Sequence, residues 1–180
     1  MHHPNQDIDL ITPMPKASQP QLSHFDSSGQ AGMVDVSAKQ PSRRTATASA
    51  FVELSAAVLT ALPTNPKGNP LEVARFAGIQ AAKRTADLIP MCHPLTLSHV
   101  DVRAGIVPGG VRITATAAAV GPTGVEMEAL TAAAVAALTV YDMTKALDKA
   151  IVIRNVQLEA KSGGKSGEFL RAGAAPDPRQ

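Results

Sequence analysis

Apolar residues recur along this chain with two different spacings. In four segments apolar and polar residues alternate, as they do in a strand that buries one face. In two others the apolar residues lie three or four positions apart, as in a helix that packs on a core. We therefore predict strands at residues 44–54, 96–107, 111–116 and 151–161, and helices at residues 71–88 and 126–147.

Prolines and glycines mark the ends of these elements. Pro70 stands in a favoured first-turn position of the first helix, and Pro90 ends it. Pro108 and the two glycines after it supply the turn between the second and third strands. The second helix contains neither residue type and is dominated by alanine. The order βαββαβ predicts a ferredoxin-like α+β sandwich, an antiparallel sheet with both helices on one face.

The length of 180 residues favours one domain with a sizeable core. Residues 1–20 and 171–180 lack periodicity, so we predict disordered tails around a single domain at residues 21–170. The chain has no apolar run of about 18 residues and no secretory signal, which predicts a cytoplasmic protein. Its one cysteine, Cys92, excludes an internal disulfide and a cysteine-rich zinc site.

The charge pattern favours a local anion site over a basic surface. The formal net charge is only +2, whereas a nucleic-acid-binding domain usually carries a basic stripe that neutralises many phosphates. We therefore expect no nucleic-acid partner. The basic residues nonetheless concentrate in segments that carry other chemistry: Lys67, Lys83, Arg84, Lys145, Lys149, Lys161 and Lys165.

Asp142 and Lys145 form a candidate proton-transfer pair near the end of the second helix. Three positions apart, they share one helical face. Such a pair can exchange protons if burial raises the carboxylate pKa and lowers the ammonium pKa. Spacing alone, however, favours an exposed ion pair between the two residues.

Glu126 and Glu128 occupy the first turn of the same helix. Carboxylates are favoured there by the helix dipole, so a capping role alone could explain them. Since they are two positions apart, they project to different faces, and only one easily points at a given ligand.

Cys92 and His93 follow Pro90 and so fall on a loop or strand entrance. A lone His is more often a hydrogen-bonded structural residue, and a lone Cys an inert small hydrophobe. The spacing argues against metal binding by this pair. His93 could instead donate to a phosphate or relay a proton near neutral pH.

A glycine-rich segment at residues 160–167 invites comparison with a P-loop. Glu159 stands where that motif requires glycine, and no helix follows, so the motif fails in sequence and context. What remains is a segment with Lys161, Lys165 and unobstructed backbone amides that could close over phosphate. The alternative is a solvent-exposed glycine-rich loop.

Four blocks of this sequence together resemble the cyclic pyranopterin monophosphate synthases, enzymes of molybdenum cofactor biosynthesis. The blocks are KRTADLIPMCHPL at 83–95, GVEMEA at 124–129, YDMTK at 141–145 and AKSGGKSG at 160–167. The resemblance runs from about residue 22 to residue 169. It implies a lyase that converts 3′,8-cyclo-7,8-dihydroguanosine 5′-triphosphate to cyclic pyranopterin monophosphate and releases diphosphate. This reaction needs no redox cofactor, and we expect no metal.

The resemblance also implies roles for individual residues. Catalytic acid and base groups are expected at Asp142, Lys145 and Lys67. Substrate contacts are expected at Met91, Cys92, His93, Met127, Glu128, Glu126, Lys83, Arg44, Lys161 and Lys165. The family further implies a homohexamer, a trimer of dimers, in which motifs of neighbouring chains complete each pocket. No membrane partner is expected.

Two other readings of the sequence are a ferredoxin-like module that binds a nucleotide or RNA without catalysis, and a structural oligomer built on the alanine-rich helix. The first would need exposed aromatic residues on the sheet for base stacking, and Phe51 and Phe76 do not form such a pair. Only the enzyme reading predicts diphosphate release from the cyclised triphosphate.

Overall fold

The computed structural model describes residues 29–173. Residues 35–173 fall in one compact unit, whereas residues 29–34 belong to another, so each is considered by itself. The predicted N-terminal tail, 1–20, lies outside the described residues, as do residues 174–180 of the predicted C-terminal tail. The backbone amide of Arg171, the first residue of that tail, donates a hydrogen bond to the carbonyl oxygen of Glu159.

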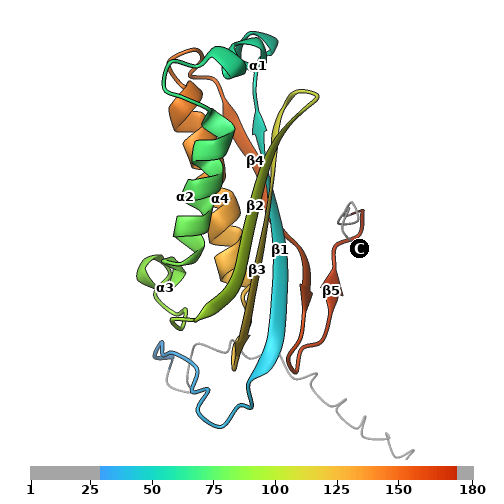
Figure 1. Cartoon of the computed structure of the whole chain (residues 1–180). Helices are drawn as coiled ribbons and strands as arrows, with labels where there is room; N and C mark the ends of the chain where they lie inside the picture. Colours follow the sequence, from blue (N-terminus) through green and yellow to red (C-terminus); the bar gives the residue numbers. More distant parts are fainter. Residues whose placement is uncertain (1–28, 174–180) are drawn as a thin grey trace, which may run out of the picture. The chain divides into compact units, whose positions relative to one another are not determined.

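An antiparallel sheet of five strands carries the larger unit (Figure 1). Its strands are β1 (Ser42–Glu53), β2 (Leu97–Val107), β3 (Gly110–Gly121), β4 (Val152–Ser162) and β5 (Phe169–Leu170), in the order β2-β3-β1-β4-β5. Every neighbouring pair is antiparallel. The central strand β1 buries alternate residues from Ala46 to Val52, as the alternation in its sequence predicts.

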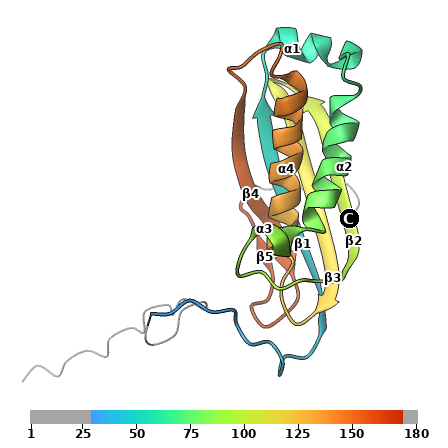
Figure 2. The ribbon, with the colours of Figure 1, turned by 90° about the vertical axis from the view of Figure 1, so that its left-hand side faces the viewer.

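Two long helices, α2 (Pro70–Ala82) and α4 (Glu126–Thr144), lie side by side on one face of the sheet (Figures 1 and 2). Asn69 caps α2, because its side-chain oxygen accepts from the amides of Leu71 and Glu72, and Pro70 follows in the first turn. The short helix α3 (Thr85–Leu88) comes next. The predicted α+β sandwich with helices on one face is confirmed.

Several element boundaries differ from the sequence prediction. The strand β3 continues to Gly121, beyond the predicted end at residue 116, and α4 ends at Thr144, before the predicted end at residue 147. The segment predicted as one helix, 71–88, is divided into α2 and α3. The helix α1 (Ala56–Ala61) and a 3-10 turn (Leu62–Thr64) follow the first strand in a region to which the sequence assigned no helix. The two-residue strand β5 was not predicted, since its pairing with β4 depends on position and not on an alternating pattern.

The core is built mainly from alanine and valine. On α4 the side chains of Ala129, Ala132, Ala133, Ala136 and Ala137 are all fully buried. Small side chains let α2 and α4 approach closely, so that a Cβ on Gly78 would lie 2.9 Å from the Ala132 carbonyl oxygen. Among residues 29–173, no helix is both long and apolar enough to cross a membrane.

Candidate active site

The first turn of α4 is tied to the end of β4 by an ion pair. The Lys161 ammonium lies 2.9 Å from a carboxylate oxygen of Glu126 and also donates to the hydroxyl of Ser166, 3.2 Å away. Both charged side chains are about three-quarters buried, with 22% and 28% of their surface exposed. The N-cap residue Val125 offers no side-chain cap. Glu126 therefore positions a lysine, which is more than the capping role that the sequence left open.

Glu128, one half-turn further along α4, is only 4% exposed. Burial raises the pKa of this carboxyl, a backbone hydrogen bond partly opposes the shift, and the charge of Glu126 adds to it. Partial burial raises the pKa of the Cys92 thiol, and the Glu128 charge raises it further, which places the two side chains near each other. The loop carrying Met91, Cys92 and His93, all half-buried, thus reaches the start of α4.

Arg44 joins the entrance of α4 to the glycine-rich segment. Its guanidinium donates to the carbonyl oxygens of Gly121 and Pro122, at 3.0 and 3.1 Å. A Cβ on Gly164 would lie 2.0 Å from the same guanidinium, so only glycine allows this approach. In this arrangement Arg44 holds two parts of the site together, whereas a direct contact with substrate stays a prediction.

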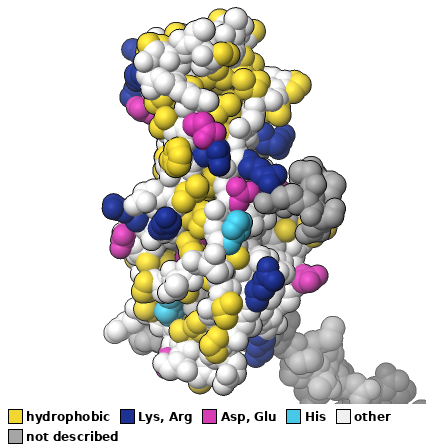
Figure 3. All heavy atoms as spheres, viewed as in Figure 1, with side chains coloured by type: hydrophobic (Ala, Val, Ile, Leu, Met, Phe, Trp, Pro, Cys, Tyr) yellow, Lys and Arg dark blue, Asp and Glu magenta, His cyan; other side chains and the backbone are white. Residues whose placement is uncertain are grey.

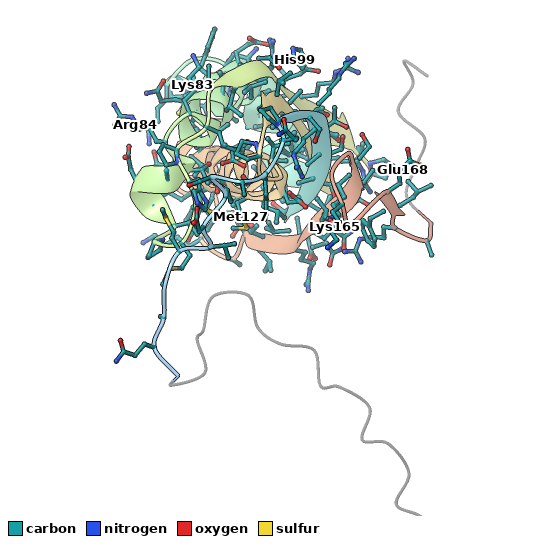
Figure 4. All side chains as sticks on the ribbon, turned by 90° about the horizontal axis from the view of Figure 1, so that it is seen from below. Lys83, Arg84, His99, Met127, Lys165 and Glu168 are labelled. Atoms are coloured by element: carbon teal, nitrogen blue, oxygen red, sulfur yellow. The ribbon has the colours of Figure 1, made fainter. Side chains whose placement is uncertain are left out.

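We call the residues around the first turn of α4 the N-terminal cluster: Arg44, Met91, Cys92, His93, Glu126, Met127, Glu128 and Lys161, with Lys165 beside them. Viewed along the sheet from this end, the side chains of Met127 and Lys165 lie on neighbouring parts of the surface (Figure 4). The cluster contains a thioether, a buried carboxyl and the cations of Arg44, Lys161 and Lys165. Such a set can hold an apolar, hydrogen-bonding ring system and its anionic substituent.

The opposite end of α4 carries a second group, which we call the C-terminal cluster: Lys67, Asp142 and Lys145. The Lys145 ammonium lies 2.7 Å from the Asp142 carboxylate, and both side chains are at least half exposed. Lys67 Nζ donates to the backbone carbonyl of Asp142 at 3.4 Å. Asn65, in the same loop as Lys67, donates to the Met143 carbonyl at 2.9 Å and so fixes that loop against the helix end.

In this cluster the hydrogen bond between Asp142 and Lys145, reinforced by their charges, lowers the pKa of the carboxyl and raises the pKa of the ammonium. Both groups are therefore charged over a wide pH range in the isolated chain. The exposed ion pair that the spacing favoured is what the structure contains. Proton exchange between them needs an environment that reverses both shifts.

The two clusters lie far apart within one chain. Glu126 and Asp142 are separated by 16 helical positions, and at 1.5 Å per residue the helix spans roughly 24 Å between them. In Figure 1 the two ends of α4 lie at opposite ends of the sheet. The structure therefore brings together the predicted substrate-contact residues other than Lys83, and separately the predicted acid and base residues, but does not bring the two groups to one point.

Lys83 is the predicted site residue that joins neither cluster. It caps the C-terminal end of α2 and lines a groove with His99 and the first residues of β2. In Figure 4 Lys83 and His99 lie on the side away from Met127 and Lys165. His99 and Ser166 were not among the predicted site residues: His99 lies in an edge strand outside every motif, and within the block at 160–167 only the lysines were singled out. Within residues 29–173, no group of three or more His, Cys, Asp and Glu side chains could hold a metal ion.

The fold is that of an α+β protein of ferredoxin-like topology, with the predicted site residues gathered in two separate clusters. The chain belongs to the MoaC family, whose model matches residues 33–164. A protein from Streptomyces griseus subsp. griseus, named cyclic pyranopterin monophosphate synthase, is 54% identical over 164 residues, 89% of this chain and 93% of its own. A protein of the same name from Deinococcus radiodurans is 53% identical over 167 residues, 91% of this chain and 98% of its own. The resemblance seen in the sequence is thus confirmed.

Proposed function

We propose that this chain is a cyclic pyranopterin monophosphate synthase, a lyase of molybdenum cofactor biosynthesis. The proposal rests on the sequence identity of 54% and 53% with two proteins named cyclic pyranopterin monophosphate synthase, over about nine-tenths of the chain. The substrate is 3′,8-cyclo-7,8-dihydroguanosine 5′-triphosphate, and the products are cyclic pyranopterin monophosphate and diphosphate. Closing the cyclic phosphate forms a bond from a substrate oxygen to the α-phosphorus and breaks the bond to the departing diphosphate.

The N-terminal cluster supplies the groups that this substrate needs for binding. Lys161 is already held by Glu126 and Ser166, so its ammonium is fixed before an anion arrives. Together with Lys165 it stabilises charge on the triphosphate and on the departing diphosphate. The buried Glu128 carboxyl, beside the exposed Met127, is the acceptor for the guanine-type edge of the ring. These roles extend the sequence prediction for the same residues.

The C-terminal cluster supplies proton transfer. Ring opening and reclosure require protons to be moved between substrate atoms, and Asp142, Lys145 and Lys67 are the groups that we assign to it. Acid–base groups act within hydrogen-bond reach of the reacting atoms, roughly 3 Å. A cluster about 24 Å along the helix from the binding groups cannot do so within one chain.

The protein therefore works as a homo-oligomer in which the N-terminal cluster of one chain meets the C-terminal cluster of another. A twofold axis pairs them reciprocally and gives two equal sites per dimer. The family resemblance implies that three such dimers form a hexamer. Exposed apolar side chains on both long helices, Phe76 at 69% and Leu138 at 57%, are consistent with further association.

The first experiment tests catalysis by Asp142. Asp142→Asn keeps size and helix context while removing the proton-transfer group, so turnover should fall by two orders of magnitude or more. Its melting temperature should match that of the wild type, because the ion pair with Lys145 is exposed. Diphosphate release from the cyclised triphosphate is the readout. Near-normal turnover in the folded variant would remove Asp142 from the mechanism.

The second experiment tests the shared site by subunit mixing. Asp142→Asn and Lys161→Ala each disable a different cluster, so a mixed dimer contains one wild-type site and one doubly altered site. Random exchange at equal amounts should restore roughly a quarter of the sites. Asp142→Asn mixed with Lys67→Ala is the matched control: both changes fall in the C-terminal cluster, so no wild-type site can form. Equal recovery in both mixtures, or in neither despite exchange, would contradict the shared site.

The RNA-binding alternative has little support on the described surface. Phe51 lies on β1 with the Arg112 guanidinium 6.0 Å from its ring, whereas Phe76 lies on α2 across the sheet, so the two rings form no stacking platform. On the face in Figure 3 the basic side chains are dispersed and form no continuous stripe. A cytoplasmic location stays a prediction, with which the free thiol of Cys92 is compatible.

A further inference from the structure

Arg171 binds the segment after β5 back onto β4. Its backbone amide donates to the Glu159 carbonyl at 2.8 Å, and its guanidinium Nε donates to the Leu158 carbonyl at 2.7 Å. The same guanidinium lies 3.9 Å from a carboxylate oxygen of Glu159 and 6.0 Å from the centre of the Phe169 ring. Since β5 has only two residues, these contacts are a large part of what holds its end in place.

Glu159 is itself fixed from two strands. Its carboxylate accepts from the hydroxyl of Ser49, on β1, and from the side-chain amide of Gln157 at 2.9 Å. Ser49 is only 5% exposed, and the Glu159 side chain is 17% exposed. The carboxylate that receives Arg171 is therefore a rigid anchor within the sheet and not a mobile surface group.

The contacts of Arg171 close a loop that carries the lysines of the N-terminal cluster. We call residues 161–168 the lysine loop. Its three glycines, Gly163, Gly164 and Gly167, all have positive φ angles, 90°, 78° and 68°. Glycine loses more conformational freedom than any other residue when it is ordered. Lys161 lies on β4 and is held by Glu126 and Ser166, but unless both ends of the loop are held, Lys165 would sample many positions relative to it.

One end of the loop is held by β1, because Gly163 packs on the Arg43 carbonyl and Gly164 on the Arg44 guanidinium. The other end continues into β5 and Arg171. Figure 1 shows the segment turning between β4 and β5, and Figure 4 shows Lys165 and Glu168 along this edge. Arg171 does not belong to either cluster and was assigned to a disordered tail by its sequence.

We propose that Arg171 and Glu159 are positioning residues that hold the lysine loop ready to bind a polyphosphate. The inference rests on the proposed function, in which Lys161 and Lys165 bind phosphate. Holding the loop beforehand removes an ordering cost that binding would otherwise carry, and it keeps the two ammonium groups at one spacing. Arg171 acts through the loop and does not touch the ligand.

The test measures binding of inorganic diphosphate to the full-length protein by calorimetry. Arg171→Ala and Glu159→Gln should each raise the Kd about 3- to 10-fold. Lys161→Ala should raise it as well. Lys165→Ala should raise it too, and the double variant Arg171→Ala/Lys165→Ala should bind no more weakly than Lys165→Ala alone, because residues that act through the same contact are not additive. In turnover with the cyclised triphosphate, Arg171→Ala should raise KM more than it lowers kcat.

Three controls separate positioning from loss of charge or of folding. Arg154→Ala removes an equal charge from β4, where Arg154 pairs with Glu53, and should leave the Kd unchanged. Arg171→Lys keeps the charge but lacks the planar guanidinium that contacts the Leu158 carbonyl and Glu159 together. It should therefore bind diphosphate almost as weakly as Arg171→Ala. Hydrogen exchange of the Gly167 amide, which donates to Gly164 within the loop, should accelerate in Arg171→Ala while the melting temperature changes little.

The outcomes distinguish the inference from the function on which it rests. A Lys161→Ala protein that binds diphosphate normally would overturn the phosphate role of the loop, and the positioning role with it. Weak binding by Lys161→Ala but normal binding by Arg171→Ala would overturn the positioning role alone. Additive losses in the double variant, or full restoration by lysine at 171, would show that Arg171 acts by its own charge, and would equally overturn it.

Discussion

Replacing Gly78 with alanine should destabilise the protein, although alanine is the better helix former. Gly78 lies in α2 where that helix approaches α4. A Cβ there would lie 2.9 Å from the Ala132 carbonyl oxygen and 3.2 Å from both γ-carbons of Val102. Ala132 and Val102 are fully buried, and the nearest of these atoms belongs to the backbone of a long helix. The clash can be relieved only by moving α2 away from α4 and the sheet.

The size of the effect follows from two opposing contributions. Overpacking a close-packed core costs about 1–3 kcal/mol, and exchanging glycine for alanine inside a helix gains about 1 kcal/mol. We expect a net loss of about 1 kcal/mol in the free energy of unfolding for Gly78→Ala. Gly78→Val adds two methyl groups at the same point and loses the propensity gain, so about 3 kcal/mol or more is expected.

Chemical denaturation of the two variants, with unfolding followed by far-UV circular dichroism, measures these differences. Ala77→Gly, at the preceding position of α2, is the control, because it measures the effect of helix propensity on the free energy of unfolding without creating a new contact. If Gly78→Ala instead raised the free energy of unfolding by about 1 kcal/mol, the full gain in helix propensity, the reasoning would be refuted. It would mean that α2 and α4 are not in close contact at this point.

Three further predictions concern stability. Burial raises the pKa of Glu128 in the folded protein, so this group lowers the stability of the native state as the pH rises above 4.5, the ordinary pKa of a glutamate. Glu128→Gln should therefore have a higher melting temperature than the wild type at pH 7, and the difference should vanish below pH 4.5. Gly163→Ala should lower the free energy of unfolding by about 2 kcal/mol or more, because the new Cβ would lie 2.1 Å from the Arg43 carbonyl oxygen. Gly167→Ala has free space around the new Cβ, so its positive φ alone should lower the free energy of unfolding by only about 1 kcal/mol. Ile113→Val, at a fully buried position of β3, should cost about 1 kcal/mol; a measured cost near zero would indicate a loosely packed core.

The sequence predicted the fold because its regular elements carry strong patterns. Alternate residues of β1 are buried from Ala46 to Val52, and the alanine face of α4 is buried throughout. The missed elements lack such a signal. The helix α1 has one buried residue, Val58, and no side-chain cap, while β5 is defined by pairing with β4 and by Arg171. Context, and not local pattern, determines these segments.

The sequence named candidate site residues but not where they lie relative to one another. The motifs identified Glu126, Asp142 and Lys161 together, and nothing in their spacing distinguishes one site from two. Only the length of α4, with Glu126 and Asp142 near its opposite ends, shows that these residues fall in two separate clusters of one chain. The role of Arg44 was also beyond the sequence, because its carbonyl partners Gly121 and Pro122 are nearly eighty positions away.

The electrostatics of the two clusters indicate why assembly and catalysis should be coupled. In the isolated chain the Asp142–Lys145 hydrogen bond lowers the pKa of the acid and raises the pKa of the base, which moves their proton affinities apart. Covering this exposed pair with the N-terminal cluster of another chain would add desolvation, which acts on both groups in the opposite direction. If the proposed assembly is correct, we therefore expect the proton affinities of Asp142 and Lys145 to approach each other only where the N-terminal cluster of a partner chain covers them.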